Sequence, residues 1–307
     1  MKKTSDKQEI EVSVIVPVVE RYDNLERLYL AYAEEIAKIT GNFEFIFIVD
    51  GNMQRAYPEI KKFSNKDPHI RVIKFPRTFG EASALSVGFE KARGEYVFTL
   101  SSYFQVEPCE FKKLYNALSK DTCDVAIARR HREGDSIINK VQSALFHFLL
   151  RIVTGARFKD ISCGFKGLKR EVIQDIEIYG DLHRFIPIIA DYKGLRVKEF
   201  VVAQREEDTR FRIYQIRTYL NRVIDIFTIF FLLRFTYKPL RFFGLVGAVL
   251  SLMGVAVNSY LIYLRLFARS IGLTDKPSLF LAALLIVVGI QFFAIGIIGE
   301  IIIYTHG

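Results

Sequence analysis

The chain has 307 residues, enough for one sizeable globular domain and a second part, and its net charge is +9. Most of the basic surplus lies beside apolar C-terminal segments, where it would meet anionic lipid headgroups, so a membrane explains the charge better than nucleic acid does. Cys109, Cys123 and Cys163 have the spacing of neither a disulfide framework nor a metal site, and we expect reduced structural thiols.

Short β-rich runs alternate with helical patterns from Ile10 to about Arg205. We expect strands at 12–16, 43–49, 70–74, 96–100, 125–128 and 195–201, and helices at 24–39, 81–93 and 110–118. This alternation is typical of an α/β fold with a parallel, doubly wound sheet. Residues 1–11 are charged and polar and lack the apolar core of a secretory signal, so we expect the domain to stay in the cytoplasm.

Two further segments, 137–153 and 213–235, mix apolar residues with recurring charges. This pattern favours helices that lie in the membrane interface with their basic residues toward the headgroups. Ordinary amphipathic core helices explain the first segment nearly as well and the second less well.

The C-terminal third contains two uncharged apolar runs, 242–264 and 278–299. About 20 apolar residues cross a hydrocarbon core of about 30 Å, so each run predicts a transmembrane helix, and a buried pair of core helices is the weaker alternative. Basic residues precede the first run in greater number than they occupy the loop between the runs, which places the large domain in the cytoplasm. We therefore expect a cytoplasmic domain at 1–210, juxtamembrane helices at 211–238, and at 239–307 two spans, about 242–264 and 278–303, with both termini cytoplasmic.

Polar residues follow several predicted strands, where ligands of open α/β sheets bind. Pro17, Val19 and Glu20 end the first strand region, and Asp50 follows the second strand. Arg77 and Gly80 precede the helix predicted at 81–93. Each of these signals is weak by itself.

Further segments follow in the same order along the chain: Arg129-Arg130-His131-Arg132, Asp160-Ile161-Ser162-Cys163-Gly164-Phe165-Lys166, Gly180-Asp181-Leu182-His183-Arg184-Phe185-Ile186-Pro187, Lys238-Pro239-Leu240-Arg241 and Gly299-Glu300. Together these motifs resemble the inverting GT-A glycosyltransferases that load a sugar onto a polyprenyl phosphate, the group that includes dolichyl-phosphate mannose synthase. The resemblance covers nearly the whole chain. It implies a Rossmann-like nucleotide-sugar domain, a nucleotide sugar and a polyprenyl phosphate as substrates, and inversion at the anomeric carbon.

The resemblance also implies site residues. The nucleotide sugar is expected at Pro17, Val19, Glu20, Asp50, Arg77, Gly80, Ser101, Ser102 and Tyr103. The acceptor lipid phosphate is expected at Arg129, Arg130, Lys140, Ser143, Arg210 and Arg212, and the catalytic residues are expected to be Asp160 and Arg132. An ionised phosphate is already a nucleophile, so the protein must supply positioning and positive charge rather than a strong base.

The expected metal ligands are missing. Relatives carry paired acids after the second strand, where Val49 replaces the first, and Asp-X-Asp after the fourth, where Ser101 and Tyr103 stand. Mg²⁺ or Mn²⁺ would be the family's cofactor, but hydroxyl groups are poor substitutes for carboxylates, so the cofactor stays open. Glu107 and Asp160 are alternative ligands.

Three hypotheses follow from this loss: a metal-independent transferase whose arginines replace the cation, an enzyme with relocated ligands, and a pseudo-glycosyltransferase that binds or scaffolds a lipid phosphate. A processive polysaccharide synthase is weaker, because its Gln-X-X-Arg-Trp motif needs a Trp and the chain has none. The expected partners are a nucleotide sugar, a polyprenyl phosphate and the lipid bilayer, without nucleic acid; the sequence leaves a homo-oligomer open.

Overall fold

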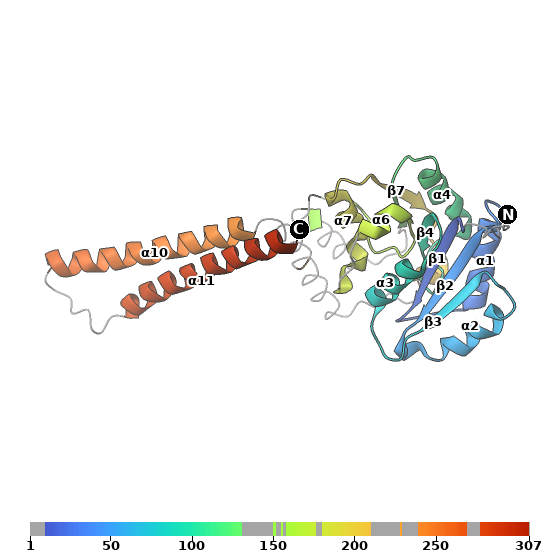
Figure 1. The fold of residues 1–307 in the computed structure, drawn as a ribbon, viewed down its shortest axis with the longest axis horizontal. Coiled ribbons are helices and arrows are strands. Elements are labelled where there is room, and N and C mark those ends of the chain that lie inside the picture. Colours follow the sequence, from blue (N-terminus) through green and yellow to red (C-terminus); the bar gives the residue numbers. More distant parts are fainter. Residues whose placement is uncertain are drawn as a thin grey trace, which may run out of the picture. The chain divides into compact units, whose positions relative to one another are not determined.

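A computed structural model describes residues 10–130, 150–151, 155, 158–175, 180–209, 228, 239–268 and 277–306. The chain divides into two compact units, Met1–Ile226 and Phe227–Gly307. The first is an α/β domain and the second carries two long helices (Figure 1). The amphipathic segments predicted at 137–153 and 213–235 lie almost wholly outside the described residues.

The α/β domain is built on a seven-stranded sheet in the order β3-β2-β1-β4-β6-β5-β7. Its strands are β1 (Val12–Val18), β2 (Phe43–Val49), β3 (Ile70–Lys74), β4 (Tyr96–Thr99), β5 (Val125–Arg130), β6 (Lys166–Lys169) and β7 (Val197–Val202). The six predicted strands are confirmed to within about two residues at most ends. The predicted parallel pairing holds for the other strands, whereas β6, which was not predicted, runs antiparallel to both β4 and β5 and makes the sheet mixed.

No strand pattern in the sequence predicts β6, which is four residues long and begins and ends with lysine. Its place is fixed by packing instead. A Cβ at Gly167 would lie 2.6 Å from the Phe98 ring on β4, so a larger residue cannot occupy this position without movement. Tertiary contact therefore overrides the poor strand propensity of Lys166-Gly167-Leu168-Lys169.

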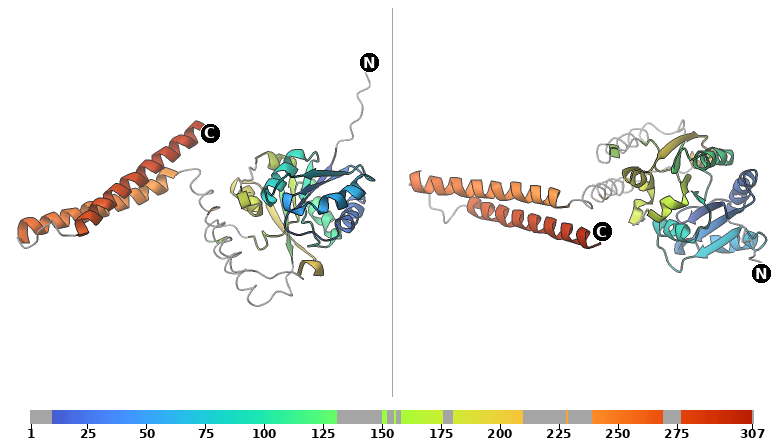
Figure 2. Two further views of the ribbon diagram at one scale, coloured as in Figure 1. Left: turned by 90° about the horizontal axis from the view of Figure 1, so that it is seen from below. Right: turned by 45° about the horizontal axis from the view of Figure 1, so that its top comes forward.

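Helices cover both faces of the sheet (Figures 1 and 2). They are α1 (Leu25–Ala37), α2 (Ala56–Ser64), α3 (Glu81–Lys91), α4 (Phe111–Ser119), α6 (Arg170–Asp175), α7 (Ile186–Tyr192) and α8 (Glu206–Thr209), with 3-10 turns η1 (Gly51–Met53), η2 (Pro108–Glu110) and η3 (Gly180–Phe185). β1 shows why two layers form: Val12, Val14 and Val16 pack with α1 and α4, whereas Ile15 packs with α3. Alternate residues of a strand face opposite sides, so a strand apolar on both faces is buried on both.

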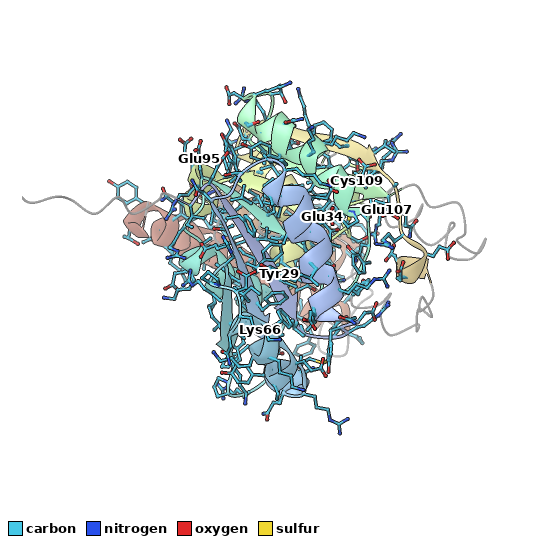
Figure 3. All side chains as sticks on the ribbon, turned by 90° about the vertical axis from the view of Figure 1, so that its right-hand side faces the viewer. Tyr29, Glu34, Lys66, Glu95, Glu107 and Cys109 are labelled. Carbon is cyan, nitrogen blue, oxygen red and sulfur yellow. The ribbon has the colours of Figure 1, made fainter. Side chains whose placement is uncertain are left out.

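Two of the three cysteines are buried, as expected of structural thiols, and all three are free. Cys109 is exposed and lies near Glu107 on the outer surface of the domain in Figure 3. Partial burial raises the pKa of its thiol, and Glu110 and Glu107 raise it further. The thiol of Cys109 is therefore protonated and weakly nucleophilic near neutral pH.

A buried carboxylate joins the amino ends of the strands. Glu44, on β2, accepts hydrogen bonds from Ser13 (2.8 Å), Arg71 (2.9 Å) and the Arg93 guanidinium (2.7 Å). Burial opposes ionisation, but the hydrogen bonds from Arg93, Arg71 and Ser13 outweigh it and lower the pKa of Glu44 below its ordinary 4.5. Glu44 thus stabilises the fold in its charged form.

Glu44→Gln is expected to lower the free energy of unfolding by about 1–3 kcal/mol at pH 7, because Arg71 and Arg93 lose their buried counter-ion. A lowered folded pKa contributes stability above the ordinary value of 4.5 that is lost as the pH falls through the folded pKa, so the difference from wild type should vanish in acid. Urea unfolding between pH 3 and 7 measures it. Glu90→Gln, at a 68 % exposed side chain, is the control and should change little.

The second unit is a pair of helices, α10 (Pro239–Ala268) and α11 (Pro277–His306), which lie side by side in Figures 1 and 2. Each contains one of the predicted apolar runs. The segments Pro239–Leu264 and Pro277–Thr305 are long and apolar enough to cross a membrane. Glu300 accepts a hydrogen bond from the Leu240 backbone N–H at 3.4 Å, near the start of α10.

Small residues form the contact between α10 and α11. A Cβ at Gly289 would lie 2.6 Å from the Gly247 carbonyl oxygen, and one at Gly254 would lie 2.7 Å from the Ala282 carbonyl oxygen. Ala282 itself is fully buried. Small residues let two helix backbones approach closely, which is how apolar helices associate where lipid removes the hydrophobic driving force.

Gly289→Ala is expected to destabilise the hairpin by about 1–3 kcal/mol, because the added methyl group meets backbone atoms of α10. Gly244→Ala is the matched control, since a Cβ there meets its nearest atom at 3.5 Å. Thermal unfolding of the detergent-solubilised protein, followed by helical circular dichroism, compares the two. Equal melting temperatures would contradict the close backbone contact.

Candidate functional site

The carboxyl ends of β1, β2 and β4 meet at one edge of the sheet, and β6 begins at that same edge. The register places Thr99, the last residue of β4, opposite Lys166, the first of β6. The segments after β1, β2 and β4 and the segment before β6 therefore converge. Most of the sequence-predicted site residues that the structure describes lie here.

Asp50 holds the loop that precedes α3. It is fully buried, and its two carboxylate oxygens accept the backbone N–H groups of Phe79 (2.8 Å) and Gly80 (3.3 Å). Gly80 has a φ of +86°, which favours glycine. Gly51 packs against the backbone of the same loop, where no side chain fits, because a Cβ at Gly51 would lie 2.2 Å from the carbonyl carbon of Arg77.

Asp50 therefore positions the loop that carries Arg77 and Gly80, and its direct contact with a nucleotide stays a prediction. Arg77 is exposed, with its guanidinium carbon 4.9 Å from the centroid of the Phe79 ring. Pro17 and Val19 are buried at the end of β1, whereas Glu20 is exposed. Among these donor-site candidates, the exposed Glu20 and Arg77 present charged side chains to solvent.

The loop after β1 is tied to the segment after β4. The Ser102 hydroxyl donates to the Arg21 carbonyl oxygen, and the Asp23 backbone N–H donates to the Ser102 carbonyl oxygen at 3.2 Å. The Arg21 side chain binds Asp23 through Nη2 at 2.8 Å and also donates to the Glu207 carbonyl oxygen at 3.3 Å. These bonds fix Arg21 relative to residues 101–103.

The residues at the expected metal position do not fit a divalent cation. Ser101 and Tyr103 offer neutral hydroxyl groups, which are weak ligands for a hard cation. The Arg21 guanidinium carbon lies 4.3 Å from the centroid of the Tyr103 ring, so positive charge already lies against this segment. Within the described ranges, no three His, Cys, Asp or Glu side chains form a group that would hold a metal ion.

The alternative metal ligands are engaged by arginines. Glu107 lies 3.5 Å from Arg205, and Asp160 is paired with Arg130. Asp160 is 2 % exposed, and its two oxygens bind the Nε and Nη2 groups of Arg130 at 2.8 and 2.9 Å. A carboxylate that already neutralises a bidentate guanidinium is a poor ligand for a second cation.

Arg130 joins three segments through buried charge. Besides Asp160, its Nη2 donates to Ser162 at 3.0 Å and its Nη1 lies 3.2 Å from Asp208 on α8. Two buried carboxylates thus hold the Arg130 guanidinium, and its expected contact with the acceptor phosphate stays a prediction. Neighbouring residues of a strand face opposite sides of the sheet, so the half-buried Arg129 of β5 is directed away from Arg130.

A second titratable cluster lies between η3 and α3, in the segment that the sequence singled out at 180–187. His183 is 4 % exposed with Nε2 3.2 Å from Glu81, yet neither ring nitrogen makes a well-aligned hydrogen bond to a described residue. Burial opposes ionisation of Glu81, but His183, followed by Arg184 and Lys166, lowers the pKa of Glu81 to about 2. The contact between His183 and Glu81 therefore joins η3 to the start of α3.

Five predicted residues lie outside the described part of the chain: Arg132, Lys140, Ser143, Arg210 and Arg212. Their roles at the acceptor phosphate, and that of Arg132 in catalysis, stay predictions. Asp160 is among the described residues, and its carboxylate accepts hydrogen bonds from Arg130 and Ser162.

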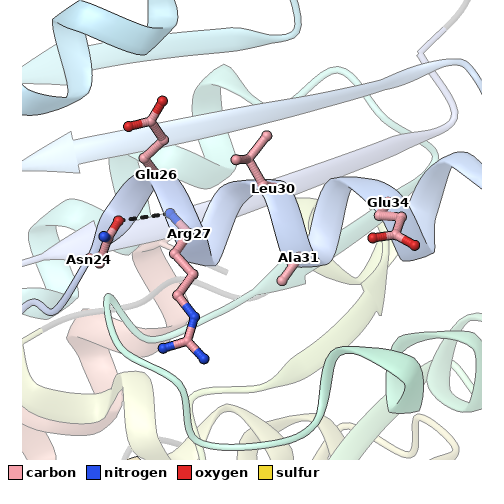
Figure 4. Close-up of a pocket in the computed structure, with 6 residues that line it drawn as sticks. All are labelled: Asn24, Glu26, Arg27, Leu30, Ala31 and Glu34. Atoms are coloured by element: carbon pink, nitrogen blue, oxygen red, sulfur yellow. Dashed lines mark hydrogen bonds between the residues drawn. The ribbon is translucent and has the colours of Figure 1, made fainter.

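A shallow hollow on α1 does not supply a better candidate site. Asn24, Glu26, Arg27, Leu30, Ala31 and Glu34 line it (Figure 4). The Asn24 side chain accepts the Arg27 backbone N–H at 2.8 Å and caps the helix. In Figure 4 the charged groups of Glu26, Arg27 and Glu34 do not converge on one point.

Sequence reasoning missed several residues that build the site. Gln105 accepts the Gly164 backbone N–H at 2.8 Å and donates to the Tyr103 hydroxyl at 2.9 Å. Thr99 donates to the Gly164 carbonyl oxygen at 2.6 Å. Arg21 carried one signal, a basic residue in the loop after the first strand, but nothing in the sequence pairs it with Tyr103.

Asp50→Asn is expected to loosen the loop at 77–80, because the amide NH₂ group would face a backbone N–H that now donates to a carboxylate oxygen. A lost charge-assisted hydrogen bond at a buried site costs about 1.5–3 kcal/mol, which urea unfolding measures. The exposed Asp191→Asn is the control. Unchanged stability of Asp50→Asn would contradict the loop-holding role.

Comparison with curated proteins gives relatives that span nearly the whole chain. The dodecaprenyl-phosphate galacturonate synthase of Rhizobium johnstonii is 23 % identical over 304 residues, covering 97 % of this chain and 89 % of the relative. The undecaprenyl-phosphate 4-deoxy-4-formamido-L-arabinose transferase of Proteus mirabilis is 29 % identical over 292 residues, covering 95 % and 88 %.

Solved structures share the fold of the α/β domain. Glucosyl-3-phosphoglycerate synthase from Mycobacterium tuberculosis in complex with UDP aligns with a TM-score of 0.53 at 14 % identity, covering 71 % of this chain and 79 % of that one. These are GT-A neighbours, so the predicted fold class is confirmed. The model of Glycosyl transferase family 2 matches residues 13–177, more than half of the chain, and the protein belongs to this family of glycosyltransferases.

Proposed function

We propose that this protein transfers a sugar from a nucleotide diphosphate donor to a polyprenyl phosphate, with inversion at the anomeric carbon. One observation carries the proposal: the similarity to the Proteus mirabilis transferase continues past the family domain, over 292 residues. The family model itself ends at residue 177. Both relatives named above are transferases or synthases of polyprenyl-phosphate sugars by name.

The α/β domain supplies the expected place for the donor. The edge where β1, β2 and β4 end carries the loop held by Asp50 and the segment 101–103. An acceptor phosphate is ionised at neutral pH and attacks without a strong general base. The protein must align the two substrates and neutralise the departing nucleoside diphosphate.

The acceptor side of the proposal rests on basic residues. Arg132, Lys140, Ser143, Arg210 and Arg212 keep their predicted role at the lipid phosphate, and Arg129 adds a half-buried cation at the end of β5. Arg132 is proposed to act directly on the reacting phosphate. Asp160 acts through Arg130, whose position it fixes in the buried ion pair.

The membrane part of the proposal rests on α10 and α11. Both are long enough to span a bilayer, and a two-span hairpin returns the chain to the side from which it entered. The excess of basic residues before α10 favours a cytoplasmic α/β domain with both termini on that side. The lipid acceptor would then be glycosylated at the cytoplasmic face.

Membranes that contain the protein are expected to convert a radiolabelled nucleotide sugar and undecaprenyl phosphate into an organic-soluble labelled lipid. A panel of UDP- and GDP-sugars identifies the donor, since the fold does not distinguish among them. Undecaprenol, which lacks the phosphate, is the matched control and should give no labelled lipid.

A second function has one specific observation in its favour, the loss of acids at Val49, Ser101 and Tyr103. A pseudo-glycosyltransferase would bind the lipid phosphate without transfer. Absence of labelled lipid across the whole panel, with and without Mg²⁺ or Mn²⁺, would contradict the transferase proposal and favour the pseudo-glycosyltransferase.

A further inference from the structure

The segment after β4 lacks the carboxylates that hold a cation but keeps a defined shape. Ser102 is 4 % exposed and bonded to the Arg21 carbonyl oxygen, and Gln105 donates to the Tyr103 hydroxyl at 2.9 Å. Burial raises the pKa of Tyr103, so its hydroxyl stays neutral at physiological pH. The segment is therefore an ordered, uncharged surface.

Arg21 lies against this surface. Its guanidinium carbon is 4.3 Å from the centroid of the Tyr103 ring, a distance at which an aromatic face attracts a cation. Its side chain is 26 % exposed, so solvent reaches it, and its Nε and Nη2 groups donate to the two oxygens of Asp23 at 3.3 and 2.8 Å. The Asp23 side chain is itself 34 % exposed, so a phosphate that binds the guanidinium fork would displace this carboxylate. Tyr103, which stands where an aspartate was expected, thus contacts a cation that the protein itself supplies.

Guanidinium groups suit a diphosphate. The fork of N–H donors binds two phosphate oxygens at once, and the charge does not depend on pH in the physiological range. Arg21 also belongs to the loop after β1, which the fold brings to the donor edge of the sheet. Arg21 thus supplies positive charge near the place where the negative charge of a departing nucleoside diphosphate is expected to develop.

We propose that Arg21, held over Tyr103, binds the diphosphate of the nucleotide donor in place of a divalent cation, so that donor binding is independent of metal. The proposal rests on the proposed function, because it assumes a nucleotide diphosphate donor. Arg21 is then a direct binding residue and Tyr103 a positioning residue. The Tyr103 ring, rather than its hydroxyl, does the positioning.

Calorimetry with UDP and with GDP tests the proposal on the detergent-solubilised full chain. The wild-type protein is expected to bind either UDP or GDP, with the same affinity in EDTA as in Mg²⁺. Arg21→Ala should weaken that binding at least tenfold in EDTA, and Arg21→Lys should weaken it less, because lysine keeps the charge but loses the fork. Arg27→Ala is the matched control: this arginine lies 5.4 Å from the Phe104 ring with a side chain 60 % exposed, and its loss should leave affinity unchanged.

Two Tyr103 variants separate the ring from the hydroxyl. Tyr103→Phe keeps the ring and should bind as wild type does, whereas Tyr103→Leu should lower affinity about threefold, the loss expected from an exposed cation–π contact. A thermal unfolding curve for each variant shows whether it folds. If Arg21→Ala does not fold, the affinity of Arg21→Lys for the diphosphate in EDTA tests the role of Arg21.

Other outcomes overturn the proposal in distinguishable ways. Binding by wild type that requires Mg²⁺, or Arg21 variants that bind as tightly as wild type in EDTA, would overturn the role of Arg21 and leave the transferase function standing. Failure of wild type to bind either diphosphate, with or without Mg²⁺, would overturn both.

Discussion

The buried ion pairs of Arg130 are the interactions on which the edge of the sheet at the carboxyl ends of β1, β2 and β4 depends. Arg130 lies at the end of β5 and binds Asp160, which precedes β6, and Asp208 on α8. An unpaired charge at such depth is strongly unfavourable, and removal of one partner from a buried pair costs about 3–5 kcal/mol. These three segments are therefore held in one arrangement. Glu207, next to Asp208, extends the same arrangement to Arg21 through its carbonyl oxygen.

Much of the fold was predictable, because the signals are local and strong. The strand Val12–Val18 is apolar on both faces, and Leu25, Leu28, Tyr32 and Ile36 recur at helical spacing in α1. The two long helices were predictable because each contains a long uncharged apolar run, which is rare in helices of water-soluble proteins. β6 was missed because its short, lysine-bounded segment becomes a strand only through packing against Phe98.

The predicted strand ends indicate which candidate residues lie near one another, but not the contacts that each of them makes. Asp50, Asp160 and Tyr103 all lie in the described segments at or near the carboxyl edge, as the strand ends suggested. Their partners are set by long-range contacts: Asp50 bonds a loop 29 residues away, and Arg130 bonds Asp208 across 78 residues. A single sequence carries no signal for such pairs, so the ion pairs of Arg130 with Asp160 and Asp208 were not predicted.

The carboxylate of Asp23 has a consequence for turnover. It lies 2.8 Å from the guanidinium of Arg21. Under the proposal for Arg21, an incoming diphosphate would compete with this anion, which belongs to the protein itself. Such an internal competitor would lower the affinity for the donor and, equally, for the nucleotide left after transfer. Because an attached carboxylate is always at high effective concentration, it would bind the arginine again as soon as the product loosens. Enzymes limited by product release gain speed from such a displacing group, and here the chain would carry its own.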